Sequence, residues 1–533
     1  MAGNLALILH AHLPFVRHPE QEHFLEEEWL FEAITETYIP LLQMMQRLID
    51  DAVPFKLTMS ITPTLSAMLQ DELLQKRYLE HVDLLIDLAA RERKRNRDNL
   101  PLRELGQFYL DLFSETRRFF VEECKRDLLG RFRQLRETGS LEIIASAATH
   151  GLLPLLQQQS SKAARAQVLI GRDVYVDLFG GQPTGFWLPE CAYAPGLETV
   201  LQEANIRWFV LDTHGLLFGN PQPRRAIYAP CYTRAGPAAF ARDRDSSRQV
   251  WSAHEGYPGD PAYREFYRDI GFDLPLEHLG PVARGMRKFS GVKYYRITGR
   301  GPEKEWYDRA AAEKAAEMHA MHFLEQRREQ LRRLHAPHFD PIIVIPFDAE
   351  LFGHWWFEGP RFLELCIRKA AEQEDFQLTT PSEYLASHPT QQRIEAARST
   401  WGENGQLGVW LDPSNVWIYP HLHAATRKMI ELAQRVVADE PAGGTPALQT
   451  PPLNERVLKQ LARELLLAQA SDWAFLIKTG TAREYATKRT LDHLMRFNRL
   501  HDQFIGNKVD QDFLSDCEWR DNLFPNVNWR YYS

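Results

Sequence analysis

The sequence predicts an α/β fold built on a parallel sheet, and two observations carry that prediction. From the start of the chain to about residue 395, short apolar runs alternate with long helical patterns. Polar or ionisable residues also follow each of these runs at the same end. In a closed α/β barrel those ends share one face, where catalytic groups lie.

Six runs are short, rich in Val, Ile, Leu or Phe, and bounded by Pro, Gly or polar residues, which is typical of buried strands. They cover residues 5–9, 56–61, 141–145, 184–188, 207–211 and 342–345. The residues that follow them are His10 and His12, Thr62, Thr149 and His150, Glu190, Asp212 and His214, and Asp348 and Glu350. Helical patterns, such as those over 28–50 and 305–334, separate the runs.

The length of 533 residues suits two to four domains, or one large barrel with additions. We expect a catalytic barrel over 1–395, with a helical excursion near 66–135 and a rim insertion near 220–290. From about residue 396 the pattern is helical. Residues 396–533 are therefore expected to form a helical C-terminal domain that contributes aromatic residues to the cleft.

The composition excludes several classes of partner. The chain carries 63 basic and 71 acidic residues, a net charge of −8, whereas nucleic acids and anionic membranes attract a basic surface. No window approaches the ~18 apolar residues of a membrane span. The N-terminal apolar run lacks the basic region and cleavage site of a signal peptide, so we expect a cytoplasmic protein. The five cysteines show no CxxC pairing, which argues against a disulfide framework or a thiolate metal site.

Two acidic segments carry the candidate chemistry. "GFWLPECAYAP" (185–195) places Glu190 directly after a predicted strand, and "IIVIPFDAELFGHWWFEG" (342–359) places Asp348 and Glu350 among aromatic residues. Apolar surroundings raise the pKa of a carboxyl group toward the value that a general acid needs. Glu190 and one of the other two acids could face each other and cleave a glycosidic bond. The residues alone leave open whether the second acid is Asp348 or Glu350.

Aromatic and histidine residues support a sugar ligand but also allow another hypothesis. Several of the 13 tryptophans lie in polar, Gly-rich stretches such as "STWGENGQLGVWLDPSNVW" (399–417), and exposed indole rings bind the C–H faces of sugars. His10, His12 and His150, with an Asp nearby, could instead hold a metal in a deacetylase-like hydrolase. They serve equally well as hydrogen-bond donors to sugar hydroxyls. A glucan-binding protein without catalytic activity is the third alternative.

Seven segments, in this order, resemble glycoside hydrolase family 57 and within it the 1,4-α-glucan branching enzymes. They are "HAHLPFV" (10–16), "SAATHGLLPLL" (146–156), "GFWLPECAY" (185–193), "AAFARDRDSSRQVWSAHEGYPGDPAYREFYRDIGFD" (238–273), "PFDAELFGHWWFEGP" (346–360), "STWGENGQLGVW" (399–410) and "QASDWAFLI" (469–477). The long 238–273 match points to the branching-enzyme subgroup.

The resemblance implies an incomplete (β/α)7 barrel, similar to a TIM barrel, with an inserted rim region and an all-α C-terminal domain. It makes Glu190 the nucleophile and Asp348 the general acid/base of a retaining transglycosylation, in which a fragment of an α-1,4-glucan moves to a 6-hydroxyl and forms an α-1,6 branch. It implies an α-glucan such as amylose as partner and no metal or organic cofactor. The oligomeric state stays open, and a monomer is compatible with it. The alternatives within the family are a 4-α-glucanotransferase and an α-amylase.

The resemblance also implies a set of substrate-binding residues. They are His10, His12, Trp29, His150, Trp187, Arg264, Arg268, Gly285, Trp401, Trp410 and Asp472. Arg268 is preferred over Arg264. The chain departs from the pattern at 231–240, where the rim loop is compact, whereas some family members carry a longer loop with a tyrosine over the cleft. Whether Tyr232 replaces that tyrosine decides the balance between transfer and hydrolysis.

Overall fold

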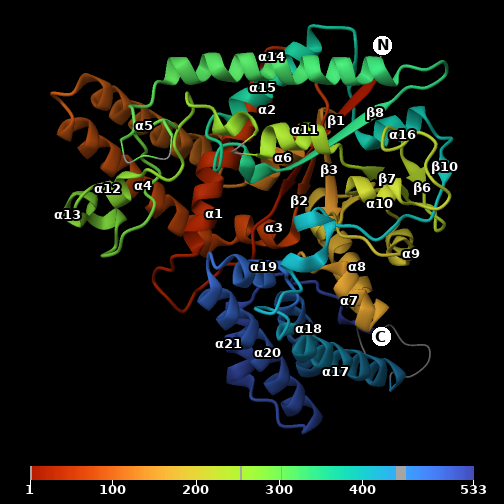
Figure 1. The fold of residues 1–533 in the computed structure, drawn as a ribbon. Helices are drawn as coiled ribbons and strands as arrows, with labels where there is room; N and C mark the ends of the chain where they lie inside the picture. The colour runs from red at the N-terminus through yellow and green to blue at the C-terminus, as the bar shows by residue number, and fades with distance from the viewer. Residues whose placement is uncertain (1–2, 253–254, 300, 302, 440–451) are drawn as a thin grey trace.

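The computed structural model describes residues 3–252, 255–299, 301, 303–439 and 452–533, and its centre is a curled parallel sheet (Figure 1). Neighbouring strands in the order β8-β1-β2-β3-β4-β5-β7 are all parallel. Their bounds are β1 Asn4–Ala11, β2 Leu57–Ile61, β3 Leu141–Ser146, β4 Gly185–Trp187, β5 Trp208–Leu211, β7 Ala238–Ala241 and β8 Ile342–Asp348. Three two-residue strands extend the sheet: β6 Cys231–Tyr232, β9 Gln377–Leu378 and β10 Gln392–Arg393.

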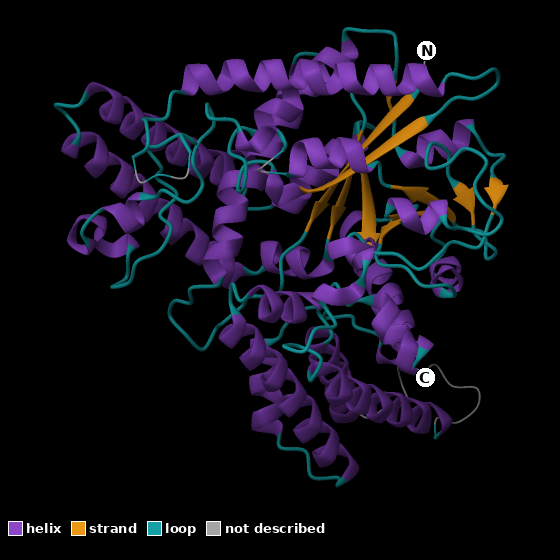
Figure 2. Ribbon diagram, viewed as in Figure 1, coloured by secondary structure: helices purple, strands orange, loops and turns teal. Residues whose placement is uncertain are grey.

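A single β-bridge joins the two ends of the seven-strand arc. Arg242, directly after β7, forms a parallel bridge with Val344 of β8, and the Asp243 amide donates to the Val344 carbonyl at 2.8 Å. The sheet therefore curls into the incomplete (β/α)7 barrel that the resemblance implies, and the predicted fold class is confirmed. Figure 2 shows the strands converging inside a shell of helices.

All six predicted strands are present, and one strand of the barrel was missed. Residues 220–290 were expected to form a rim insertion, yet they contain β7, a strand of the barrel, and the helix α11 (Arg244–Trp251). The sequence of β7 is Ala-Ala-Phe-Ala, and alanine is depleted in strands. Burial and pairing with β5 and β6, rather than intrinsic propensity, make this segment a strand.

The helices cover the outer face of the barrel and fill the excursions. After β1 come α1 (Glu27–Ala33), the π-helix η1 (Ile34–Tyr38) and α2 (Ile39–Asp50), and after β2 come α3 (Pro63–Gln70), α4 (Glu72–Arg95), α5 (Leu100–Arg118) and α6 (Leu128–Glu137). The remaining barrel-side helices are α7 (Leu153–Gln159), α8 (Ser161–Phe179), α9 (Leu197–Glu203), α10 (Thr213–Leu217), α12 (Ile270–Asp273), α13 (Leu276–Leu279), α14 (Arg309–Leu334), α15 (Gly359–Ala371) and α16 (Pro381–Ser387). In Figure 1 the α4–α5 pair projects to one side together with α12 and α13.

The C-terminal part of the chain is all-α, as predicted. Its helices are α17 (Ile418–Ala438), α18 (Pro452–Ala468), α19 (Ser471–Thr479), α20 (Arg483–Ile505) and α21 (Gln511–Arg520). They lie below the barrel in Figure 1, drawn in blue. Within the described ranges, no helix combines the length and apolar content that crossing a bilayer requires.

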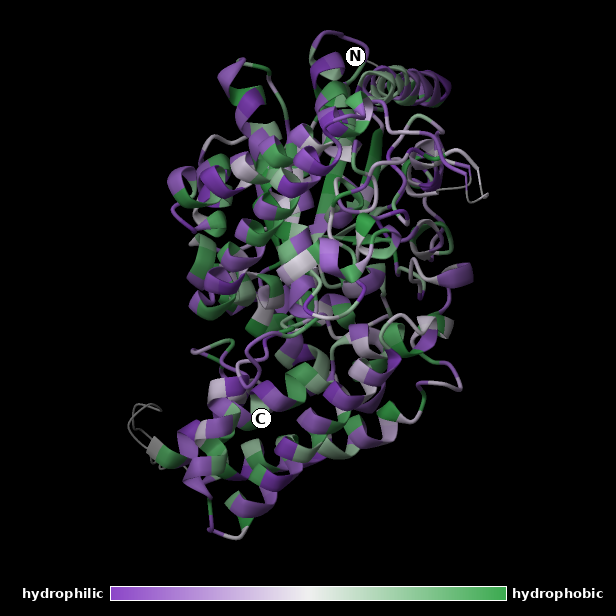
Figure 3. Cartoon of the chain, turned by 90° about the vertical axis from the view of Figure 1, so that its left-hand side faces the viewer, coloured by the Kyte–Doolittle hydropathy of each residue, from purple (hydrophilic) through white to green (hydrophobic). Residues whose placement is uncertain are grey.

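The core follows from the hydrophobic pattern of the strands. Every residue of β1 is buried, as expected for a central parallel strand that is covered on both faces. Figure 3 shows the hydrophobic colour along the central strands, whereas the surrounding helices carry both colours. The strand ends can therefore present polar side chains at one mouth while the rest of the sheet stays apolar.

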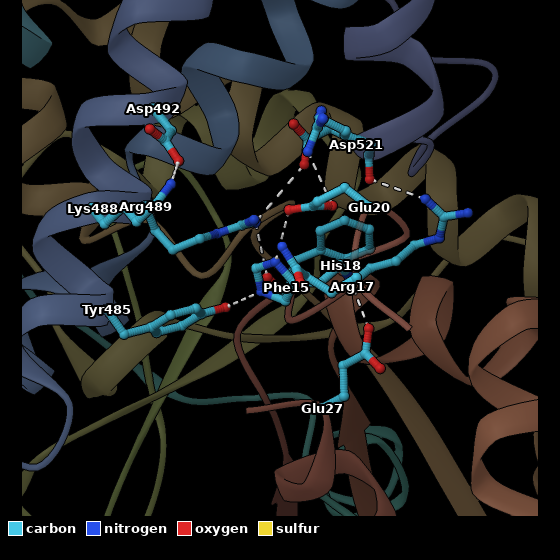
Figure 4. Close-up of polar contacts among 12 residues, drawn as sticks. Phe15, Arg17, His18, Glu20, Glu27, Tyr485, Lys488, Arg489, Asp492 and Asp521 are labelled. Atoms are coloured by element: carbon cyan, nitrogen blue, oxygen red, sulfur yellow. Dashed lines mark hydrogen bonds and ion pairs between the residues drawn. The ribbon is translucent and has the colours of Figure 1, made fainter. Parts of the chain in front are cut away.

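The C-terminal helices meet the barrel at the carboxyl ends of its strands. The Ser471 amide, at the start of α19, donates to the His150 carbonyl at 3.1 Å. Figure 4 shows a second contact, in which α20 holds the segment after β1: Arg489 donates to the Phe15 carbonyl at 3.1 Å, and Tyr485 Oη lies 2.8 Å from His18 Nε2. The C-terminal part thus contacts the segments that follow β1 and β3.

We expect Gly171→Ala to destabilise the fold. A Cβ atom at Gly171, inside α8, would lie 2.0 Å from the Ser146 carbonyl oxygen at the end of β3, so the helix must move off the sheet. Overpacking of this kind costs about 1–3 kcal/mol of unfolding free energy, which a lowered thermal midpoint would reveal. Gly408→Ala is the matched control, because no atom lies within 4 Å of its Cβ position. Equal midpoints for the two variants would contradict the expectation.

Candidate active site

Glu190 lies in a tight turn whose backbone is strained. β4 ends at Trp187, and in the turn that follows Glu190 and Cys191 have φ angles of 61° and 47°. Non-glycine residues in this left-handed region cost about 1–3 kcal/mol and persist only where neighbours hold them. Thr400 Oγ1 and the Trp401 amide donate to the Glu190 carbonyl at 2.9 and 3.1 Å. The turn is therefore fixed by residues more than 200 positions away in the chain.

The carboxylate of Glu190 receives donors from the C-terminal region. Trp401 Nε1 donates to Oε2 at 2.8 Å, and Ser471 Oγ donates to Oε1 at 3.4 Å. His150 Nδ1 lies 3.7 Å from Oε1. An indole N–H can only donate, so the contact with Trp401 favours the ionised form of Glu190.

Three histidines stack beside Glu190. The ring centroids of His12 and His150 are 3.8 Å apart, and His10 Nε2 lies 3.0 Å from His150 Nε2. Burial and the charge of His12 hold the pKa of His10 and of His150 well below the usual value. Burial also acts to lower the pKa of His12, but Asp472, whose Oδ1 lies 3.0 Å away, raises it above the usual value, helped by other carboxylates. The stack thus concentrates one positive charge on His12.

Asp348 and Glu190 face the same charged histidine and influence each other. Asp348 ends β8, where its Cα pairs in register with that of His10. Burial raises the pKa of Asp348 to about 6, opposed by the charges of His12 and Arg242 and by a hydrogen bond from Trp251. Burial raises the pKa of Glu190 to about 7, opposed by the Trp401 hydrogen bond and reinforced by the charge of Asp348. Such a pair titrates together and retains one proton between these values.

Glu350 is held in a different way. Tyr38 Oη donates to its carboxylate at 2.6 Å, and the His12 amide donates to the same oxygen at 3.1 Å. Burial raises the pKa of Glu350 to about 7. These two donors bind the turn after β8 to η1 and to the residue that follows β1, so Glu350 is equipped to position its neighbour Asp348.

Three predicted residues beside Glu190 are half-buried, whereas two predicted tryptophans are almost fully covered. His12, Trp401 and Asp472 are partly exposed. Trp29 is also partly exposed, and its ring centroid lies 5.9 Å from that of Tyr485. Trp187 and Trp410 are 0% and 2% exposed, and their contact with a substrate stays a prediction. Trp187 packs between His10 and Trp401, at centroid distances of 4.5 and 5.1 Å. The Trp410 ring packs against Gly402, where a Cβ atom would come within 2.6 Å of it.

The three predicted residues of the insertion lie in other surroundings. Arg264 is buried, with Nη2 3.7 Å from Glu36 Oε1. Arg268 lies over the Tyr295 ring at 4.6 Å and pairs with Asp273 at 3.2 Å. Gly285 has a φ of 81° and open space at its Cβ position. Their contact with a substrate, and the preference for Arg268, stay predictions; residues 253–254 of the 238–273 motif lie outside the described residues.

Sequence reasoning missed three residues of this site: Ser471, Arg242 and Trp251. Ser471 bridges Glu190 and His150, whose Nδ1 lies 2.9 Å from its hydroxyl. Arg242 lies 5.6 Å from the Trp401 ring and follows β7, the strand that was not predicted. If β7 had been predicted, Arg242 would have been a candidate site residue, because it is the polar residue that follows this strand.

One group of residues matches the metal-site hypothesis, but its ring nitrogens already form hydrogen bonds within the protein. His12, His150 and Asp472 offer ligand atoms within 4.8 Å of one another. The ring nitrogens of His12 lie 3.0 Å from Thr62 Oγ1 and 3.0 Å from Asp472, and those of His150 contact Ser471 and His10. Hydrogen bonds within the protein therefore already orient both rings.

Comparison with known proteins gives one consistent family. The family model described as Glycosyl hydrolase family 57 matches residues 6–397, and the one described as 1,4-alpha-glucan branching enzyme, C-terminal, matches residues 421–532. A 1,4-alpha-glucan branching enzyme of Thermococcus kodakarensis is 34% identical, over 99% of this chain and 78% of the relative.

Two solved structures are similar over the full chain. The alpha-amylase AmyC of Thermotoga maritima has a TM-score of 0.92 at 43% identity, covering 100% of this chain and 99% of its own. The GH57-type branching enzyme of Pyrococcus horikoshii has a TM-score of 0.88 at 34% identity, covering 100% and 97%.

We expect Trp401→Phe to raise the pKa of Glu190 further. The variant removes the donor to Oε2, and a hydrogen bond to a charged group corresponds to a shift of about one to two pKa units. Infrared difference titration of the carboxyl band, assigned with Glu190→Gln, measures the shift. Trp187→Phe is the control, because Trp187 Nε1 has no partner among the described residues. Equal shifts in both variants would refute the role of the Trp401 donor.

Proposed function

Because the chain belongs to glycosyl hydrolase family 57, we propose that it is a 1,4-α-glucan branching enzyme. One observation carries the proposal: the region that matches the branching-enzyme C-terminal family supplies Ser471 and Asp472 to the carboxylate site. That region is therefore part of the reaction centre. The proposed substrate is an α-1,4-glucan such as amylose.

In the first half of the proposed reaction, Glu190 attacks the anomeric carbon of the glucan and Asp348 protonates the departing glycosidic oxygen. The bond to that oxygen breaks, and a covalent glycosyl-enzyme forms on Glu190. The hydrogen-bond donors to Glu190 support its role as nucleophile, because they favour its ionised form. His12, paired with Asp472, places a positive charge beside both carboxyl groups.

In the second half, Asp348 takes the proton from the 6-hydroxyl of another glucan, and that oxygen displaces Glu190 from the anomeric carbon. The product carries an α-1,6 branch, and both acids return to their starting state. Water competes with the 6-hydroxyl for the same intermediate, so branching requires the site to exclude water until the acceptor binds. Trp401 and the rim insertion are proposed to provide that cover.

Hydrolysis by an α-amylase is the second candidate within the family. The Thermotoga maritima protein, 43% identical, is named as an alpha-amylase. Some family members carry a longer rim loop with a tyrosine over the cleft, and Tyr232 is the candidate for that tyrosine in this chain. The Tyr232 hydroxyl donates a hydrogen bond to the Pro389 carbonyl at 3.1 Å. The two candidates share the glycosyl-enzyme and differ only in the acceptor.

We also propose a barrel over 1–395 and a C-terminal domain over 396–533, which the limits of the two family matches support. A cytoplasmic location and a role in glycogen synthesis complete the proposal. All five cysteines are buried and free, which suits a reducing compartment.

Branching predicts that the protein, acting on amylose, lowers iodine absorbance and yields products from which isoamylase releases new chains. Glu190→Gln should reduce the rate by about 10³-fold or more while glucan binding persists, because only the nucleophile is lost. Gln46→Glu, on the exposed face of α2, is the control for a change at a distant surface site. Linear products with new reducing ends would reject branching in favour of hydrolysis.

The shared proton predicts a narrow pH optimum. Glu190 loses its nucleophilic form as the pH falls below about 7, and Asp348 loses the proton for the leaving oxygen as the pH rises above about 6. We therefore expect kcat/KM to peak between these values. Asp348→Asn, assayed with an activated glycosyl fluoride that needs no acid, should lose the alkaline limb. A plateau that extends unchanged to pH 9 would contradict the assignment.

A further inference from the structure

An exposed tryptophan stands on the turn that follows β8. The Trp355 side chain is 54% exposed, and one face of its ring stacks on Phe266 at a centroid distance of 4.6 Å. The Phe266 ring is itself held from another direction by the Lys293 ammonium, 4.1 Å from its centroid. An indole ring that is supported on one face and open on the other is rigid and partly apolar. Such a surface suits the C–H face of a sugar ring.

Polar groups with defined hydrogen-bonding roles lie beside this ring. His354 Nδ1 lies 2.7 Å from Glu36 Oε2 and 3.9 Å from Glu32 Oε2. Burial acts to lower the pKa of His354, but the hydrogen bond and charge of Glu36 raise it, so the imidazole is kept as a donor. The Glu32 side chain is 25% exposed and offers an acceptor to a ligand above it.

The ring is connected to the proposed active site. The Trp355 amide donates to the Glu350 carbonyl at 3.2 Å, and Glu350 accepts from Tyr38, two positions after Glu36 on η1. In an α/β barrel the loop after each strand lies at the face that carries the catalytic groups. The exposed ring and Asp348 therefore belong to the same strand end and the same mouth.

We propose that Trp355, His354 and Glu32 form an additional glucan-binding subsite, which holds part of an α-1,4-glucan away from the bond that reacts. The inference rests on the proposed function and deepens it. The Trp355 ring stacks on a glucosyl unit, while Glu32 accepts and His354 donates hydrogen bonds at its hydroxyls. A ring face flanked by hydrogen-bonding side chains suits a neutral polyhydroxylated chain.

The test compares long and short substrates. Trp355→Ala should raise KM for amylose about tenfold, the factor that corresponds to ~1.4 kcal/mol, while kcat on short maltooligosaccharides stays unchanged. Trp355→Phe should restore most of the loss, because it keeps a ring, and Glu32→Gln should produce a smaller rise. Trp519→Ala is the matched control, since Trp519 on α21 is 48% exposed. An unchanged KM for amylose in Trp355→Ala would overturn the subsite.

A binding measurement separates this inference from the branching proposal. In gels that contain amylose, Glu190→Gln should be retarded, and the double variant with Trp355→Ala should be retarded much less. Equal retardation of the two proteins, both folded by thermal melting, would refute the subsite. Retardation that depends on Trp355 in a protein without branching activity would support the subsite and reject only the branching proposal.

Discussion

The strained turn at Glu190 is the constraint on which the site depends. A left-handed glutamate followed by a left-handed cysteine is not a conformation that the local sequence favours. It persists because Thr400 and Trp401 hold the Glu190 carbonyl while the Trp401 indole holds its carboxylate. Backbone strain, carboxylate orientation and the preferred protonation state thus share one source, the segment just after the barrel.

The site must also offset the repulsion among its buried carboxylates. Several carboxylates in a buried site would repel one another, and each raises the pKa of the next. The protonated His12 offsets part of this repulsion, while His10 and His150 stay neutral and orient it. Because the partner of His12 is Asp472, 460 residues away in the sequence, the charge balance requires the C-terminal helices to be in place. The barrel alone does not contain a balanced site.

Much of the fold was predictable because it depends on the period and burial of apolar runs. Six strands and the all-α C-terminal part follow from that pattern, and the polar residues at the strand ends do meet, as the contact of His10 with His150 illustrates. β7 was missed because its alanines carry no strand signal without their neighbours. The burial of Trp187 and Trp410 could not be predicted either, because the sequence suggests that an aromatic residue is near a site but not how far its ring is covered.

Residues that join two parts of the fold were the hardest to predict. Ser471 has no distinctive sequence context, and its importance comes from contacting Glu190 and His150 across the interface. The same interface also orients the Glu190 carboxylate. Trp401 and Ser471 donate to its two oxygens from the C-terminal part of the chain. A carboxylate that accepts hydrogen bonds from protein groups is held in one orientation, which suits a nucleophile that must attack along a fixed line.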